Sequence, residues 1–247
     1  MPASADSNNN DRYRYNTNER YRTIGSVKTW SRDNPKASLM ERKRAAIVDA
    51  ARELFLAGGY AQTSMDRVAE EAEVAITTVY RHFKSKDDLF SAVMQMAVKM
   101  VAPELFVSGN DADSATVFPW FTKPPQTGLR LAGIDYLTRV FDPQQMDLYR
   151  VVTRDASDFP ELGRRYLIET VGRRNRVFVE YLNYWRRSEG WKIRDPGRAA
   201  EAFVALLRAP LFEEAIHGGR RPTRKAIALQ ATRAASCLMV LLGSGCL

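Results

Sequence analysis

The fold of this chain is decided by residues 63–89, which read TSMDRVAEEAEVAITTVYRHFKSKDDL. Thr63 is a helix-capping residue with an acidic partner, Asp66, three positions on, so the pattern predicts a helix over residues 63–72. A second, very short helix is predicted over residues 75–82. Two short helices joined by a tight turn are typical of a helix-turn-helix motif.

The side chains of this stretch suit such a motif. Ala69 is small, as is required where the two helices touch, and Val74 supplies an apolar contact at the turn. Ile76, Thr77 and Thr78 are short side chains, which let the second helix sit deep in the ~12 Å major groove of DNA. The stretch therefore predicts a DNA-reading surface.

Helical periodicity continues on both sides of the motif. Apolar residues recur at three- and four-residue spacing from residue 41 to the glycine pair at 58–59, which predicts an amphipathic helix ended by glycine. A fourth helix, capped by Ser85, is predicted over residues 85–100. The predicted helix-turn-helix DNA-binding domain spans residues 41–90.

Residues 1–40 are predicted to be a disordered polar extension, because they hold an Asn-rich run and few Leu, Ile or Val residues to bury. Arginine alternates with tyrosine between residues 11 and 22, a composition that suits contact with phosphates or a minor groove. A solvated tail is the alternative, and part of the segment is consistent with a mis-assigned start codon.

The remaining chain, residues 91–247, is predicted to form a larger helical domain. A loop rich in Asp, Ser, Pro and Thr is expected from Pro103 to about Thr127, since its prolines exclude a continuous helix. Helices are predicted over residues 129–141, 144–156, 161–188, 196–215 and 224–242. No run of alternating residues predicts a strand, so the expected fold class is all-α.

The composition is typical of a soluble globular protein. Hydrophobic residues make up 45% of the chain, and no apolar run reaches the ~18 residues of a membrane helix. Two cysteines, Cys237 and Cys246, and two histidines indicate neither a disulfide framework nor a metal site. A cytoplasmic protein without metal, cofactor or membrane partner is expected.

The net charge of +8 does not by itself point to DNA, because residues 41–90 hold 8 basic and 9 acidic side chains. Individually placed Lys and Arg side chains must therefore contact the phosphates. An enzyme is the rival class, but the sequence has no Gly-rich phosphate loop, no zinc-ligand spacing and no nucleophile elbow. No catalytic residue is predicted.

Over about fifty residues the N-terminal region resembles the TetR family of bacterial repressors. The matching motifs are, in order, Gly59-Tyr60, Thr63-Ser64, Thr78-Val79-Tyr80-Arg81-His82-Phe83 and Ser85-Lys86. The resemblance implies a homodimer that binds a palindromic operator in double-stranded DNA, with the two recognition helices ~34–36 Å, or a multiple of one helical turn, apart.

The resemblance also assigns DNA-binding roles. The candidate residues are Thr63, Ile76, Thr77, Thr78, Tyr80, His82 and Lys86. Ile76 and Thr77 are expected to face base edges, and the other five to contact phosphates. Packing between helices is the alternative for Tyr80, and a surface cap is the alternative for His82.

Two residues depart from the family pattern at the turn. Glu73 stands where a glycine is usual, which costs ~1 kcal/mol if the backbone there is left-handed. Ala75 stands where a capping serine is usual, which loses a cap worth ~1 kcal/mol. The recognition helix is expected to form with altered contacts at its N-terminus.

Residues 144–218 resemble the C-terminal domain of the AefR-like branch of this family, on motifs at residues 148–152, 159–162 and 195–203. The resemblance implies a domain that binds a small molecule between helices and dimerises through its last two long helices. The apolar faces expected to form a four-helix interface comprise Ala200, Phe203, Val204, Leu207, Ile227, Ala228, Ala231, Ala235 and Leu238. Closure of the subunit core by these helices is the alternative.

Six aromatic residues are candidates to line the ligand pocket: Trp120, Phe121, Tyr149, Phe178, Tyr181 and Trp185. A role in the core is the alternative for each. Three arginine pairs, at 164–165, 173–174 and 186–187, recur along one predicted helix. They predict a solvated face, or else attraction of an acidic ligand or of flanking DNA phosphates.

These observations predict a sequence-specific transcription repressor that a small-molecule inducer releases from its operator. A ligand-independent regulator or an activator with the same DNA-binding domain is the first alternative. A non-specific DNA-binding module, with a steep salt dependence and little sequence preference, is the second.

Overall fold

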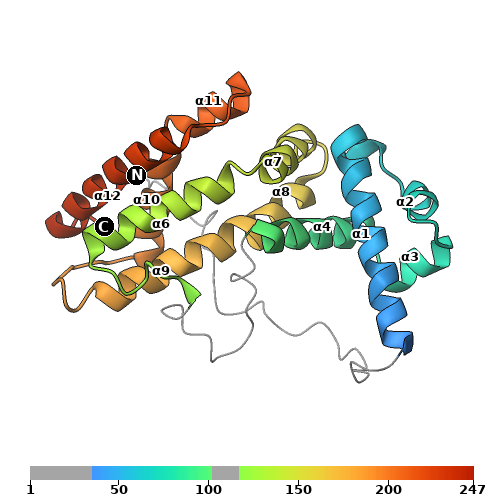
Figure 1. Cartoon of the computed structure of the whole chain (residues 1–247), viewed down its shortest axis with the longest axis horizontal. Coiled ribbons are helices and arrows are strands. Elements are labelled where there is room, and N and C mark those ends of the chain that lie inside the picture. The colour runs from blue at the N-terminus through green and yellow to red at the C-terminus, as the bar shows by residue number, and fades with distance from the viewer. Residues whose placement is uncertain (1–34, 102–116) are drawn as a thin grey trace, which may run out of the picture. The chain divides into compact units, whose positions relative to one another are not determined.

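The computed structural model describes residues 35–101 and 117–247, and every regular element within those ranges is a helix (Figure 1). The elements are α1 (Pro35–Gln62), α2 (Met65–Glu71), α3 (Ile76–His82), α4 (Lys86–Val101), α6 (Pro125–Val140), α7 (Pro143–Asp155), α8 (Pro160–Tyr166), the π-helical stretch Leu167–Gly172, α9 (Arg173–Trp185), α10 (Pro196–Arg208), α11 (Leu211–Gly218) and α12 (Arg224–Ser244). The predicted all-α class, with an N-terminal helix-turn-helix and a larger helical domain, is confirmed.

Residues 35–40, predicted to belong to a disordered extension, are helical, because α1 begins at Pro35. Proline is favourable in the first turn of a helix, where its missing N–H has no partner to lose, so Pro35 suits this start. The predictions made for residues 1–34, including their contact with DNA, lie outside the described residues.

Two of the predicted C-terminal helices are interrupted. The helix expected over 161–188 consists of α8, the π-helical stretch and α9. The prediction of one helix over 196–215 is wrong, because α10 ends at Arg208 and α11 begins at Leu211. Pro210 lies between them and lacks the N–H that a continuous helix needs.

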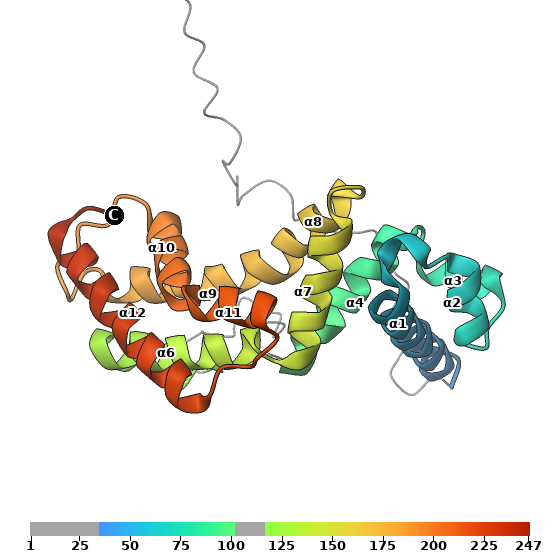
Figure 2. The ribbon, with the colours of Figure 1, turned by 90° about the horizontal axis from the view of Figure 1, so that it is seen from above.

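Two hydrophobic cores organise the described residues. The first joins α1–α4 to side chains of α7 and α8, among them Leu148, Val152 and Leu162. The second is formed by α6, α9, α10 and α12 with the segment before α6. Figures 1 and 2 show α7 and α8 beside α4. The first core includes side chains of α4, α7 and α8, all of which extend beyond residue 90. The predicted domain boundary at residue 90 therefore does not coincide with the division between the two cores.

The second core is centred on the crossing of α6 and α12, which lie side by side (Figure 1). A Cβ atom placed on Gly133 would lie 2.7 Å from Leu207 Cδ2 and 3.1 Å from Ala231 Cβ. Glycine therefore allows α6 to approach α10 and α12 this closely.

This packing corrects the prediction of the dimer interface. All the residues expected at that interface are buried inside the subunit except Ala228, which is half-buried: Ala200, Phe203, Val204, Leu207, Ile227, Ala231, Ala235 and Leu238. Their apolar faces are used to close the subunit core, because α6 and α9 cover them. The exposed face of α12 instead carries Leu229 and Val240.

Helix α12 is also long and apolar enough to cross a membrane by length and composition, with a mean hydropathy of 1.5 over 18 residues. Its apolar side chains Ile227, Ala231 and Leu238 are buried against the neighbouring helices. Burial in the core covers 39% of that window and accounts for part of its hydropathy.

Substitution of Gly133 tests the α6–α12 crossing. The Gly133→Val variant is expected to lower the free energy of unfolding by about 1–3 kcal/mol, because the added atoms have no room beside Ala231. Urea denaturation measures the change. The matched control is Gly243→Val on α12, where no atom lies within 4 Å of an added Cβ. Equal losses in the two variants would contradict this account of the packing.

Candidate nucleic-acid interface

The helix-turn-helix comprises α2, the turn at residues 72–75 and α3. Val68, Ala69 and Val79 are buried between the helices, so the predicted small contact residue is where the motif requires it. Helix α2 is capped by Ser64, whose Oγ accepts a hydrogen bond from the Arg67 N–H at 3.2 Å. The sequence placed this cap one residue too early, at Thr63.

Thr63 itself faces inward, which corrects the role predicted for it. Its side chain is 2% exposed, and its hydroxyl donates to the Gly59 carbonyl oxygen at 2.8 Å. That carbonyl lies where α1 leaves helical geometry, since Gly59 has φ 86°. Thr63 therefore satisfies the end of α1 and does not offer its hydroxyl to a phosphate.

Lys86 likewise has a structural role that its sequence position did not reveal. Its ammonium donates to the carbonyl oxygens of Tyr60 and Thr63, each at 3.0 Å, and lies 4.3 Å from the centre of the Tyr60 ring. Burial lowers the pKa of Lys86, and the nearby Asp87 and Asp155 carboxylates partly offset this. Two of its three donors are thus committed within the protein, whereas Lys86 also lines an open groove, so its contact with a phosphate stays a prediction.

The turn between α2 and α3 has the two features predicted from its sequence. Glu73 adopts φ 51°, the left-handed conformation that costs a residue with a Cβ about 1 kcal/mol or more. Ala75 precedes α3 in an extended conformation and offers no side-chain hydrogen bond to the helix. The reading helix therefore starts from a strained turn and without a side-chain cap.

Fewer side chains of α3 are exposed to solvent than the sequence predicted. Thr77 is exposed, and Tyr80 is 53% exposed, so neither is needed for the core. Ile76 is half-buried and packs partly against the first core. Thr78, at 8% exposure, faces inward, so the prediction that it presents its hydroxyl to a phosphate is wrong.

His82 ends α3 and is half-buried. Its Nε2 is buried and has no hydrogen-bond partner among the described residues. Burial lowers the pKa of His82, and the positive charges of Arg81, Arg44 and Lys43 lower it further. At neutral pH this side chain is uncharged, so it offers a donor or an acceptor rather than a cation.

An open groove of about 540 Å³ runs along the start of α2 and the end of α3. Gln62, Ser64, Tyr80 and Lys84 line it, together with two further predicted residues, Thr63 and Lys86. Sequence reasoning missed Ser64 and Lys84. The basic character of Lys84, next to the buried Phe83, was the signal that could have identified it.

Asp155, at the end of α7, ties the motif to the helices that follow. Its carboxylate accepts from the Tyr60 N–H at 2.6 Å and from Arg154 Nε at 2.8 Å. Burial acts to raise the pKa of Asp155, but the hydrogen bonds from Arg154 and from the Tyr60 N–H outweigh it and hold that pKa below its usual range. Gly59 has φ 86°, a conformation that L side chains rarely adopt, so glycine is favoured beside this pair.

A second link joins α8 to α4. Arg165 donates to Ser91 Oγ at 2.7 Å and to Asp88 Oδ1 at 3.1 Å, and it also pairs with Glu161 at 3.0 Å. The ring of Phe159, just before α8, stands edge-on to Tyr60 at 5.1 Å. Helices α7 and α8 are thus bonded directly to the elements that carry α2 and α3.

The six aromatic residues proposed as pocket lining instead form packed contacts. Trp120, Phe121, Phe178 and Tyr181 are buried and in ring contact with one another. The Tyr181 hydroxyl donates to the Lys123 carbonyl at 3.0 Å, and Trp185 Nε1 donates to the Phe121 carbonyl at 3.1 Å. Tyr149 lies elsewhere, with its ring edge-on to Tyr166 and Phe212.

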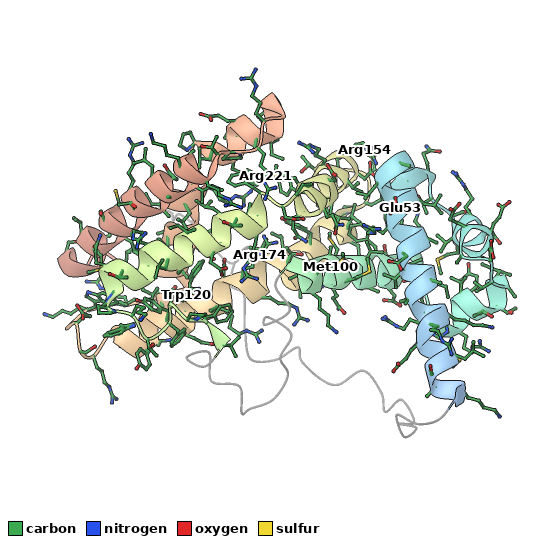
Figure 3. All side chains as sticks on the ribbon, viewed as in Figure 1. Glu53, Met100, Trp120, Arg154, Arg174 and Arg221 are labelled. Atoms are coloured by element: carbon green, nitrogen blue, oxygen red, sulfur yellow. The ribbon has the colours of Figure 1, made fainter. Side chains whose placement is uncertain are left out.

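A small cavity of about 10 Å³ lies instead between α6, α8, α9, α10 and α11. Its lining includes Tyr136, Tyr166, Arg174, Asn175, Arg208 and Phe212, and none of the six predicted residues. Figure 3 places Arg174 near the start of α9 and Trp120 near its far end. The candidate ligand site is therefore displaced along α9 from the predicted one, because the aromatic side chains fill the space expected to hold a ligand.

The described residues contain no group of three His, Cys, Asp or Glu side chains able to hold a metal ion. The geometry defines a class, namely a helical regulator with an N-terminal helix-turn-helix. Two family models match the chain: the bacterial regulatory proteins of the tetR family over residues 47–93, and the AefR-like transcriptional repressor C-terminal domain over residues 127–241. The chain belongs to the TetR family of transcriptional regulators and is not an enzyme.

Named relatives are similar over a short stretch of the chain. The transcriptional activator FasR of Mycolicibacterium smegmatis is 38% identical over 58 residues, 24% of this chain and 26% of that protein. The transcriptional repressor KstR of Rhodococcus jostii is 36% identical over 66 residues, 27% of this chain and 31% of that protein. The chain thus matches less than a third of the length of these relatives.

Solved structures extend the likeness to most of the chain. A TetR-family regulator from Mesorhizobium loti superposes with a TM-score of 0.67 at 22% identity, covering 82% of this chain and 97% of that one. The flavonoid-responsive regulator FrrA gives a TM-score of 0.64 at 24% identity, covering 81% and 96%. At these identities the likeness establishes a shared fold.

The strain at the turn predicts a stabilising substitution. Replacing Glu73 by glycine is expected to raise the free energy of unfolding by about 1 kcal/mol, because glycine adopts positive φ without a Cβ clash. Glu70→Gly, inside α2, is the control and is expected to lower it by about 1 kcal/mol. Chemical denaturation of both variants checks the signs, and a loss of stability in Glu73→Gly would refute the account of the turn.

The pKa of Asp155 predicts a pH-dependent contribution to stability. Asp155→Asn is expected to lower the free energy of unfolding by about 1–3 kcal/mol at pH 7, because charge-assisted bonds to Tyr60 and Arg154 are lost. A carboxyl with a lowered folded pKa stabilises above its unfolded pKa of about 4, and this stabilisation is lost as the pH falls through the folded value.

The difference between wild type and Asp155→Asn should therefore shrink below about pH 4. Urea denaturation between about pH 3 and 7 measures it. Asp147→Asn, in the exposed pair with Arg150, serves as the control and should change stability little at any pH. A difference that stays constant down to pH 3 would show that the carboxylate charge is not responsible.

Proposed function

We propose that the protein is a dimeric repressor that binds a palindromic operator through α3 and is released by a small-molecule ligand bound among its C-terminal helices. The observation that carries the DNA-binding part is the exposed face of α3, where Thr77 and Tyr80 stand clear of the core beside the groove lined by Ser64 and Lys84. Exposed side chains on the second helix of such a motif are the ones that reach DNA.

Each exposed residue suits a particular contact. Thr77 and the outer part of Ile76 would face base edges, with the Ile76 methyl groups suited to a thymine methyl. Tyr80, Lys84 and Ser64 would contact phosphates and set the register of the motif. His82, being uncharged, would act as a neutral hydrogen-bonding group. Thr63, Thr78 and Lys86 would support these residues from within the protein.

The dimer would form through the exposed face of α12. Leu229 is 49% exposed and Val240 is 71% exposed on a helix whose opposite face is buried in the core. Apolar side chains on the open face of a long helix favour helix–helix association, so the α12 helices of two copies would pack against each other. A two-fold pair of α3 helices would then match the symmetry of a palindromic operator.

Release by a ligand is supported by the bonds between the two parts of the chain. Helices α7 and α8 reach the cavity through Gln145 and Tyr166, and they hold α1 and α4 through Asp155 and Arg165. A ligand that prefers a different arrangement of α7 and α8 would shift the population away from the DNA-binding arrangement, by an amount set by its differential affinity.

Activation is the second candidate function, because the similar regulator FasR is named an activator. The same DNA contacts serve both signs of control, so the α3 surface is common to the two. A non-specific DNA-binding module is distinguished from both by its indifference to sequence.

Fluorescence anisotropy with a duplex from the intergenic DNA upstream of the coding sequence tests the DNA-binding proposal, with a scrambled duplex alongside. We expect a preference of about 10³-fold for the intergenic duplex, and a loss of at least about tenfold in its affinity for Thr77→Ala and Tyr80→Ala. Tyr184→Ala is the matched control, because Tyr184 is 55% exposed on α9 and should not affect DNA binding.

The salt dependence separates the remaining outcomes. Binding of both duplexes with equal affinity and a steep loss in salt would favour the non-specific module. If Tyr80→Ala and Tyr184→Ala changed the DNA affinity equally, the proposal that α3 contacts DNA would be refuted.

A further inference from the structure

The cavity between α6, α8, α9, α10 and α11 is lined by two arginines and, among the described side chains, by no carboxylate. Arg174, from α9, and Arg208, at the end of α10, both line it. Arg174 Nη2 donates to Gln145 Oε1 at 2.7 Å, and the Arg208 guanidinium lies 3.5 Å from the centre of the Phe212 ring. Among the side chains that the structure describes, neither guanidinium is paired with a carboxylate.

Both guanidinium groups face the same two tyrosines. Burial raises the pKa values of Tyr136 and Tyr166, while the charges of Arg174 and Arg208 act to lower both. Both cations and both tyrosines line the same cavity of about 10 Å³, so the two like charges lie near one another. Such an arrangement is costly in a medium less polar than water unless an anion joins it.

Three buried polar atoms without a partner belong to a residue that lines the cavity or to residues next to its lining. Asn175 Oδ1, Gln145 Nε2 and Thr170 Oγ1 are buried and have no hydrogen-bond partner among the described residues. Asn175 lines the cavity, Gln145 is bonded to Arg174, and Thr170 belongs to the π-helical stretch whose Val171 also lines it. Buried polar atoms are rarely left unpaired, and π-helical turns are frequent at functional sites.

We propose that this cavity binds the carboxylate of a small organic acid, with Arg174 and Arg208 as its two cationic partners. Arginine suits the task because its planar group matches a carboxylate in two parallel hydrogen bonds. The walls formed by Tyr136, Phe212 and Val140 would hold the apolar body of the acid. This inference rests on the proposed function, since it names the chemical class of the releasing ligand.

The size of the cavity and its neighbours connect this site to DNA binding. At about 10 Å³ it holds no more than a water-sized molecule, so an acid must push its lining apart to enter. Tyr166 lines the cavity, and the preceding residue, Arg165, is bonded to Asp88 and Ser91 of α4. Displacement of Tyr166 would therefore strain the hydrogen bonds of Arg165 to Asp88 and Ser91 of α4.

Matched pairs of acids and their neutral amides test the proposal on the full-length protein. Benzoate and benzamide, phenylacetate and phenylacetamide, and octanoate and octanamide differ in charge but little in shape. Calorimetric titration should show binding of at least one acid, at least about tenfold tighter than its amide. Equal binding within every pair, or no binding of any acid at millimolar concentration, would overturn the proposal.

Variants of the two arginines locate the site. Arg208→Met and Arg174→Gln should each abolish the preference for acid over amide, while Arg208→Lys should retain it at reduced affinity. Arg187→Gln, an exposed arginine near the end of the same helical run, is the matched control and should bind as wild type. An acid preference that survives both arginine substitutions would place the anion elsewhere. Thermal unfolding of each unliganded variant checks that it is folded, and the lysine variant provides the charge-preserving comparison if the methionine variant is unstable.

Anisotropy with the intergenic duplex separates this proposal from the proposed function. If an acid binds and lowers DNA affinity, both stand. If an acid binds without altering DNA affinity, the ligand class stands and release by that ligand fails. If operator binding is specific but no acid is preferred, the DNA-binding proposal stands and the carboxylate site is overturned.

Discussion

At Gly59 the backbone of α1 leaves helical geometry, and the N–H and carbonyl groups freed there lie inside the protein. Asp155 of α7 accepts the Tyr60 N–H, and Lys86 of α4 donates to two of the carbonyls. Thr63, four residues further on, donates to the Gly59 carbonyl. Because a buried unpaired backbone group costs about 1–3 kcal/mol, these side chains cannot separate without loss. The break in one helix is thus what attaches the DNA-reading helices to α4 and α7, and the orientation of α2 and α3 depends on it.

The ion pairs that join α8 to α4 are weaker than these hydrogen bonds to buried backbone groups. Arg165, Asp88 and Glu161 are each partly exposed, and ion pairs of this kind contribute about 0–1 kcal/mol. A junction that combines firmly satisfied backbone groups with weak surface pairs can hold its elements together while allowing small shifts between them. Such a balance suits a regulator, because a ligand has only a few kcal/mol of differential affinity with which to move an equilibrium. Arg165 and Tyr166, adjacent in the chain, belong to the weak junction and to the cavity respectively.

The surface proposed to read DNA shows a similar departure from maximum stability. Helix α3 begins after a left-handed Glu73 and an Ala75 that offers no cap, each worth about 1 kcal/mol against it. Strain of this kind persists where the surroundings determine the conformation, and here the buried Val79 and Phe83 hold the helix in place. Positive charge is not spread over the motif. It is confined to individual side chains such as Lys84 and Arg81, so recognition depends on placement more than on net charge.

Local patterns in the sequence were sufficient for the all-α class, for α3, for α4 with its Ser85 cap, and for the strained turn, because each depends on residues a few positions apart. The roles of Thr63, Lys86 and Thr78 were not accessible in this way. Whether a hydroxyl or ammonium faces solvent or a carbonyl depends on which distant segment packs against it, and the partners of Lys86 lie more than twenty residues away. The same holds for the aromatic residues of α9, which read equally as pocket or core until Trp120 and Phe121 are seen to fill the space beside them. Periodicity assigns a side chain to a face of a helix, but only the tertiary structure decides what covers that face, because burial arises from contacts between segments that are far apart along the chain.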